Sequence, residues 1–200
     1  MPRAANRVRI IGGNWRSRMI HFPDSAGLRP TPDRVRETVF NWLGQRLDGK
    51  VCLDLFAGSG ALGFEALSRG AARVVMVEQS RSVTQTLSEN AQHLGAEMAE
   101  IVNADGMQYL RNSKRCFDIV FLDPPFKQSM LMPILALLPP RLAADGCVYM
   151  ECEPSFAAGD RWTILKQGRA GQVKFQLMKP AVPDATSSLS NAELQQDTAP

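Results

Sequence analysis

Short apolar runs alternate with segments of helical hydrophobic spacing through the middle of the chain. The runs that predict strands span residues 51–55, 73–77, 100–103, 117–122 and 146–151. Segments with helical spacing follow the first four runs, at residues 61–69, 81–94, 107–111 and 130–138. Strands connected through helices run parallel, and almost wholly apolar strands are covered on both faces of their sheet. The pattern therefore predicts an α/β fold with a mostly parallel sheet.

The segments on either side of this repeat predict three parts of the chain. Residues 1–30 form a basic extension with few apolar side chains, whose short runs at 8–11 and 18–22 suit a β-hairpin. Residues 31–180 form the domain. It begins with a helix at Thr31-Pro32-Asp33 and ends with an antiparallel hairpin at 162–166 and 173–178. Residues 181–200 are rich in Ser, Thr, Gln and Asp and predict a disordered tail.

Arginine is concentrated in the N-terminal part of the chain. Residues 1–36 hold eight arginines against two acidic residues, although the net charge of the whole chain is only +3. A basic arm of this kind indicates a polyanionic partner, or else a solvated positive surface. The candidates for contacts to such a partner are Arg7, Arg9, Arg16, Arg18, Arg34 and Arg36.

Several classes of protein do not fit the composition. No run of about 20 apolar residues predicts a membrane span, and no apolar run follows the first residues as in a secretory signal. The four cysteines form no Cys-x-x-Cys pair and the chain has only two histidines, so we expect no metal site. We expect a cytoplasmic monomer with reduced, buried thiols.

A glycine-rich turn follows the first predicted strand of the domain. The segment from Asp54 to Gly63 reads Asp-Leu-Phe-Ala-Gly-Ser-Gly-Ala-Leu-Gly, and glycines at such a turn let a ligand approach the backbone. Glu78 ends the next strand, where a carboxylate accepts hydrogen bonds from ribose hydroxyls. Asp105 follows the third strand and suits either an adenine amino group or the N-cap of a helix. The candidate cofactor-binding residues are Asp54, Phe56, Ala57, Gly58, Gly60, Glu78, Asp105 and Gly106.

The spacing of Gly58, Gly60 and Gly63 also matches a dinucleotide fingerprint. Asp54 favours a different ligand, because a carboxylate repels the pyrophosphate that a dinucleotide places at the helix N-terminus. S-adenosylmethionine has no phosphate and carries a sulfonium and an ammonium group, so a nearby carboxylate suits it. A dinucleotide and a purely structural loop stay as alternatives at this point.

Asp123-Pro124-Pro125-Phe126 follows the apolar strand at residues 117–122. The two prolines stiffen the turn and remove two backbone donors. Backbone carbonyls and the Asp123 carboxylate are then available to accept from an amino group, while Phe126 offers a face for stacking a base. The tetrapeptide therefore indicates methylation of an exocyclic amine. Whether Asp123 takes up the proton or only orients the amine is open.

The chain resembles the bacterial small-subunit ribosomal RNA guanine-N2 methyltransferases of the RsmD family. The resemblance is carried by the segment from Asp54 to Ala71, by Phe121 to Phe126, and by two N-terminal segments, 9–18 and 28–43. It implies a Rossmann-like class I methyltransferase with a seven-stranded sheet and S-adenosylmethionine as donor. The implied acceptor is a guanine of 16S ribosomal RNA in the small subunit, handled by Asp123, Pro124, Pro125 and Phe126.

Other functions share parts of this pattern. DNA adenine or cytosine methyltransferases and protein glutamine methyltransferases also carry a loop of the Asp-Pro-Pro-aromatic kind. A non-catalytic ribosome-assembly factor would keep the fold and bind RNA, but it would not need Asp54, Glu78 and Asp123 together. An oxidoreductase would give the tetrapeptide no role.

Overall fold

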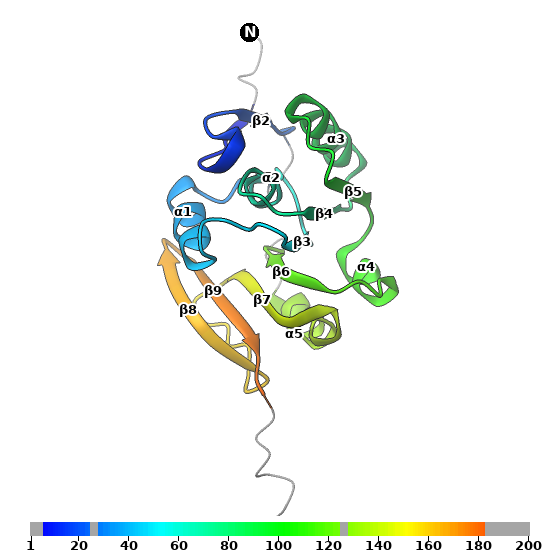
Figure 1. Ribbon diagram of the computed structural model, residues 1–200. Helices are drawn as coiled ribbons and strands as arrows, with labels where there is room; N and C mark the ends of the chain where they lie inside the picture. Colours follow the sequence, from blue (N-terminus) through cyan, green and yellow to red (C-terminus); the bar gives the residue numbers. More distant parts are fainter. Residues whose placement is uncertain (1–5, 25–27, 125–127, 183–200) are drawn as a thin grey trace, which may run out of the picture.

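A computed structural model describes residues 6–24, 28–124 and 128–182, and it contains a seven-stranded sheet between two layers of helices (Figure 1). The strand order is β5-β4-β3-β6-β7-β9-β8, and within it only β9 runs antiparallel to its neighbours. The sheet strands are β3 (Val51–Asp54), β4 (Arg73–Glu78), β5 (Ala99–Asn103), β6 (Phe117–Leu122), β7 (Leu142–Cys152), β8 (Trp162–Ala170) and β9 (Val173–Pro180). The prediction of a mostly parallel sheet with a C-terminal antiparallel hairpin is confirmed.

Each face of the sheet packs against its own helices. The helices are α1 (Asp33–Trp42), α2 (Ala61–Ser68), α3 (Arg81–Leu94), α4 (Gly106–Asn112) and α5 (Gln128–Leu137). The apolar core on one face combines side chains of α1, α2 and α3, and the other core those of α4 and α5. In β4, Val74 and Met76 enter the first core while Val75 and Val77 enter the second. This is why the strand reads as a continuous apolar run.

The N-terminal extension folds onto the first helical layer. Its strands β1 (Arg7–Arg9) and β2 (Met19–His21) form the expected antiparallel hairpin, with a 3₁₀ turn, η1 (Gly13–Trp15), between them. Glu65 of α2 accepts hydrogen bonds from the backbone of Ile11 and Gly12, both at 2.8 Å. Asn90 of α3 pairs with both backbone groups of His21. The extension is therefore fixed to α2 and α3 by buried polar groups.

β7 and β8 each run at least four residues longer than the sequence predicts. β7 begins at Leu142, although Ala143 to Gly146 have low strand propensity, because Leu142 pairs with Phe117 ahead of an irregularity in the ladder. β8 continues to Ala170 through exposed polar residues, which show no alternation but are paired with β9 throughout. A second 3₁₀ turn, η2 (Pro139–Arg141), was also not predicted.

The division of the chain into an extension (1–30), a domain (31–180) and a tail (181–200) stays a prediction. Residues 183–200, which include most of the predicted tail, lie outside the described residues. None of the described helices is long and apolar enough to cross a bilayer.

Candidate active site

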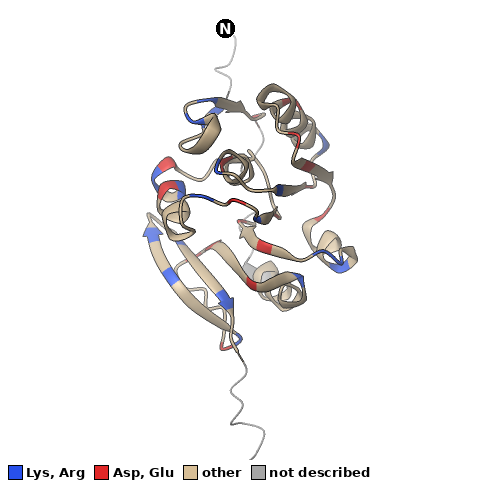
Figure 2. Ribbon diagram, in the orientation of Figure 1, with Lys and Arg blue, Asp and Glu red and all other residues tan. Residues whose placement is uncertain are grey.

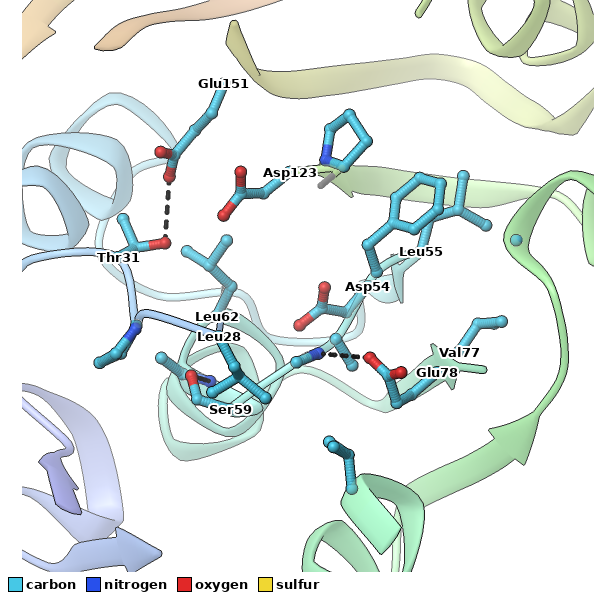
Figure 3. Close-up of a pocket in the computed structure, with 18 of the residues that line it drawn as sticks. Leu28, Thr31, Asp54, Leu55, Ser59, Leu62, Val77, Glu78, Asp123 and Glu151 are labelled. Atoms are coloured by element: carbon cyan, nitrogen blue, oxygen red, sulfur yellow. Dashed lines mark hydrogen bonds between the residues drawn. The ribbon is translucent and has the colours of Figure 1, made fainter. Parts of the chain in front are cut away.

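A cavity of about 580 Å³ lies at the carboxyl ends of the central strands (Figure 3). The chain runs outward from β3 through β4 to β5 and then returns to β6 on the other side of β3. Open α/β sheets bind ligands where the strand order reverses in this way. Four carboxylates line the cavity, each from the end of a different strand: Asp54, Glu78, Asp123 and Glu151. The volume is within the range of small-molecule sites.

The glycine-rich turn forms one wall of this cavity. Gly58 and Gly60 have positive φ values of 49° and 76°, which favour glycine. A Cβ on Gly60 would also lie 2.6 Å from the Leu87 side chain. Glu78 fixes the turn, because its two carboxylate oxygens accept from the backbone of Gly58 at 3.2 Å and of Ser80 at 2.7 Å. The turn is thus fixed in place with the backbone of Gly58 lining the cavity.

Asp54 is buried behind this turn. Its Oδ2 atom accepts from the backbone N–H of Gly63 at 3.0 Å, and the residue is 3% exposed. Burial raises the pKa of Asp54 to about 7, with a smaller contribution from the nearby Glu78 charge. No described basic residue pairs with Asp54, and a buried carboxylate in such a place favours a positively charged ligand.

We expect donor affinity to increase with pH across neutrality. A cationic donor binds the ionised form of Asp54, so below pH 7 binding must first remove a proton. The dissociation constant should be about tenfold larger at pH 6 than at pH 8, measured by calorimetry in buffers of different ionisation enthalpy. Asp54→Asn should bind weakly with a flat pH profile. Equal affinity at both pH values, with no proton exchange, would contradict this role.

The segment after β5, the third predicted strand of the domain, contributes fewer residues to the cavity wall than predicted. Gly106 lines the cavity, and a Cβ there would lie 2.9 Å from the ring of Phe56. Asp105 is exposed and caps α4, with its Oδ1 atom accepting from the backbone of Gln108 at 2.9 Å. The N-cap role of Asp105 is therefore present in the structure, while its contact to adenine stays a prediction.

The first two residues of the Asp-Pro-Pro-Phe tetrapeptide line the same cavity as the glycine-rich turn. Asp123 and Pro124 line the cavity directly after β6. Burial raises the pKa of Asp123 well above its usual value, and the charges of Glu151 and Asp54 raise it further. Pro125 and Phe126, the other two predicted catalytic residues, lie outside the described residues.

Glu151 was not predicted as a site residue. It lies near the end of β7 and accepts hydrogen bonds from Thr31 at 3.0 Å and from Tyr149 at 2.8 Å. A signal for it existed in the sequence, because Glu151 ends an apolar run just as Asp54 and Glu78 end theirs. Parallel strands bring such terminal carboxylates to one edge of the sheet.

The prediction that Arg36 contacts RNA is wrong. Its side chain is fully buried, with Nη1 3.2 Å from the Glu65 carboxylate and Nη2 2.6 Å from that of Asp33. It also donates to the backbone oxygens of Thr31 at 3.1 Å and Arg9 at 2.9 Å. Arg36 therefore ties the segment before α1 to α2 and to the extension, and it cannot reach a phosphate.

The other predicted RNA contacts are exposed but lie in two places. Arg9 and Arg34 are close to the cavity, since Arg9 pairs with Asp33 directly after lining residue Pro32. Arg18 donates to the backbone oxygen of His93 near the end of α3, and Arg16 lies near the end of α2. Because α2 and α3 begin at the cavity, the side chains of Arg16 and Arg18 lie by the ends of these helices that are farther from it, although Arg18 is next to Arg9 in the hairpin. Arg7 is exposed on β1.

The chain matches the family model described as Conserved hypothetical protein 95 over residues 8–179. It is 44% identical over 180 residues to ribosomal RNA small subunit methyltransferase D of Escherichia coli, covering 86% of this chain and 90% of the relative. The chain belongs to the RsmD family. The member of the same name from Haemophilus influenzae is 41% identical over 184 residues, covering 88% of this chain and 95% of the relative.

Solved structures give the same result for the fold of this RsmD-family chain. The E. coli methyltransferase yhhF has a TM-score of 0.80 and 43% identity, covering 88% of this chain and 98% of that chain. A methylase from Haemophilus influenzae has a TM-score of 0.74 and 38% identity, covering 88% and 99%. The protein is a methyltransferase, and its methyl donor is S-adenosylmethionine. The buried Asp54 and the open glycine turn suit this cationic, phosphate-free donor better than a dinucleotide.

Proposed function

We propose that the protein methylates the exocyclic N2 amino group of one guanine in 16S ribosomal RNA of the small subunit. The ribosomal RNA substrate is supported by the names of relatives that are 41–44% identical along most of their length. The amino acceptor is supported by one observation above all, the half-buried Asp123 directly after β6, which lines the same cavity as the donor-binding residues.

Different residues of the chain suit the binding of the donor and the orientation of the amine. Glu78, the glycine turn and Asp54 bind and orient the donor, which supplies an electrophilic methyl group on a positive sulfur. An exocyclic amine is a poor nucleophile because its lone pair is delocalised into the ring. Asp123 and the carbonyl of Pro124 accept hydrogen bonds from its two protons, which directs the lone pair toward the methyl group. Holding the reactants in line contributes about 7 kcal/mol or more to lowering the barrier.

Asp123 also accepts the proton that the nitrogen loses on methylation. A carboxylate with a raised pKa is a better proton acceptor than an ordinary one, and the raised pKa of Asp123 follows from its burial beside Glu151 and Asp54. The target base must leave its stack to reach a cavity of this depth.

Transfer of labelled methyl groups tests the proposal. The protein is incubated with labelled donor and with small subunits, free ribosomal RNA, duplex DNA or protein from a strain that lacks the enzyme. We expect label in small-subunit RNA, recovered as N2-methylguanine. Label on adenine, cytosine or protein glutamine, or a protein that binds subunits without transferring label, would overturn it.

We propose that exposed arginines beside the cavity bind RNA phosphates. Arg29 lines the cavity and is exposed, and Arg9 and Arg34 flank the same segment. Figure 2 shows the basic residues of this region on the N-terminal hairpin and α1. Arginines at such positions fix the RNA in place but read little sequence.

Replacing Arg9, Arg29 and Arg34 with glutamine should weaken RNA binding and flatten its salt dependence. Three lost phosphate contacts reduce the slope of log K against log salt by about 2 for single-stranded RNA. The matched control replaces Arg46, Arg73 and Arg115, which are exposed and paired with carboxylates. Arg46 and Arg115 lie before β3 and β6, and Arg73 begins β4, so all three are at the opposite edge. Filter binding over a salt series measures the RNA affinity and its salt slope for each triple variant. Equal effects of the two variants would show that only net charge matters.

A further inference from the structure

Glu151 has a fixed orientation that the donor site does not explain. Its Oε1 atom accepts both the Tyr149 hydroxyl and the Thr31 hydroxyl. Among the described residues no other group hydrogen-bonds to the carboxylate, so Oε2 has no described partner in the cavity that Glu151 and Asp123 both line (Figure 3). The second oxygen is therefore available to a ligand.

The two groups that donate to Glu151 are themselves buried. Tyr149 is fully buried, with its ring 6.3 Å from that of Phe121 and 6.5 Å from that of Phe175. Thr31 is buried, and the guanidinium of Arg36 donates to its backbone oxygen. Because two buried donors already orient the carboxylate, it can bind a ligand atom at a defined position with little further loss of side-chain entropy.

The location of Glu151 is costly for the fold without a ligand. Glu151 forms no ion pair with a described basic residue, and its charge lies close enough to raise the pKa of Asp123. Desolvation raises the pKa of Glu151, which is half-buried. A half-buried carboxylate beside another is stabilised when a ligand donates a hydrogen bond to it.

The chemistry of the bases indicates which ligand group this is. Next to its exocyclic amine, adenine carries the N1 lone pair and cytosine the N3 lone pair. Guanine alone places a donor, N1–H, next to the amine at C2. A carboxylate beside the amine-binding Asp123 therefore attracts guanine and repels the other two bases.

We propose that Glu151 selects guanine by accepting a hydrogen bond from N1–H through Oε2 while Asp123 and Pro124 hold the N2 amine. This inference rests on the proposed methylation of guanine N2. Glu151 on β7 then determines which base is accepted, and Asp123, directly after the neighbouring strand β6, takes part in the methyl transfer.

A base analogue tests this role directly. 2-Aminopurine keeps the amino group at C2 but carries a lone pair at N1 in place of N1–H. Small-subunit RNA is ligated with guanine or 2-aminopurine at the methylated position and assembled into subunits. The wild-type protein should methylate the guanine substrate with a kcat/KM at least about tenfold higher.

Glu151→Gln should change this preference. The glutamine amide oxygen can accept from Tyr149 and Thr31, while its NH₂ group faces the base and donates to N1 of 2-aminopurine. We expect kcat/KM on guanine to fall about tenfold or more and the preference to approach or pass unity, with donor affinity within threefold. Glu97→Gln, at an exposed glutamate between α3 and β5, serves as the matched control and should behave like the wild type.

The possible failures are distinguishable. If the preference for guanine originates at O6, it persists in Glu151→Gln. An unchanged ratio of kcat/KM on the two substrates would therefore overturn the role of Glu151 and leave the proposed function standing. A wild-type protein that transfers no label to guanine in subunits would instead overturn the proposed function. A variant that loses activity equally on both substrates would show that Glu151 only supports the structure.

Discussion

Asp123→Ala is expected to reduce methyl transfer by at least about a thousandfold while donor binding changes little. The variant removes one of two acceptors for the amine protons and the group that takes up the released proton. Orientation and proton transfer together are worth several orders of magnitude in rate. Single-turnover transfer to small subunits measures the loss, and calorimetric titration with the donor shows that the cofactor site is intact.

Loss of the fold cannot account for this result. Burial and the charges of Glu151 and Asp54 raise the pKa of Asp123, so its ionised form destabilises the folded protein above its unfolded pKa. Removing the carboxyl group should therefore leave the unfolding midpoint at pH 8 unchanged or higher. Asp123→Asn keeps a carbonyl acceptor but cannot take a proton, so its activity separates the two roles. Full activity of Asp123→Ala would place the reaction centre elsewhere.

Arg36→Met is expected to lower the free energy of unfolding by about 3–5 kcal/mol, the usual effect of breaking a buried ion pair. The variant removes donors to Thr31 and Arg9 and leaves Glu65 with less compensation in a buried environment. Urea unfolding followed by circular dichroism measures the change. The salt slope of RNA binding should stay the same, because Arg36 is not on the surface.

A surface pair provides the control for Arg36. Arg46 pairs with Asp48 at 2.7 Å, but both side chains are largely exposed, so Arg46→Met should leave the unfolding midpoint unchanged. The double variant Arg36→Met with Glu65→Gln should recover part of the loss, since it leaves less uncompensated charge. Equal midpoints for Arg36→Met and Arg46→Met would contradict the buried network.

The sequence predicted the parts of the molecule that follow from local pattern. The runs at 73–77 and 117–122 became strands covered on both faces, because every side chain in them except Arg73 and Asp118 is apolar. Asp54, Glu78 and Asp123 were recognised because each follows such a run. Their convergence needed only the rule that parallel strands end at one edge.

What the sequence did not predict depends on contacts between distant residues. Arg36 belongs to a basic stretch and looks like a surface residue, and its buried partner Glu65 lies on another helix, 29 positions away. Glu65 is itself the single charged residue within α2, where every residue is buried, which is a sign that a partner was needed. Thr31 and Glu151 are 120 positions apart in the chain, so their hydrogen bond has no local signal.

The position of β9 between β7 and β8 sets the order in which the nascent chain completes its fold. β8 is made before β9, yet among the described strands β8 pairs with β9 alone, so it has no described partner until β9 has left the ribosome. Val173 at the start of β9 lines the cavity, and Phe175 packs against Tyr149. The wall that orients Glu151 is therefore finished last, and a chain that is still being synthesised through β8 has no complete site for its substrate.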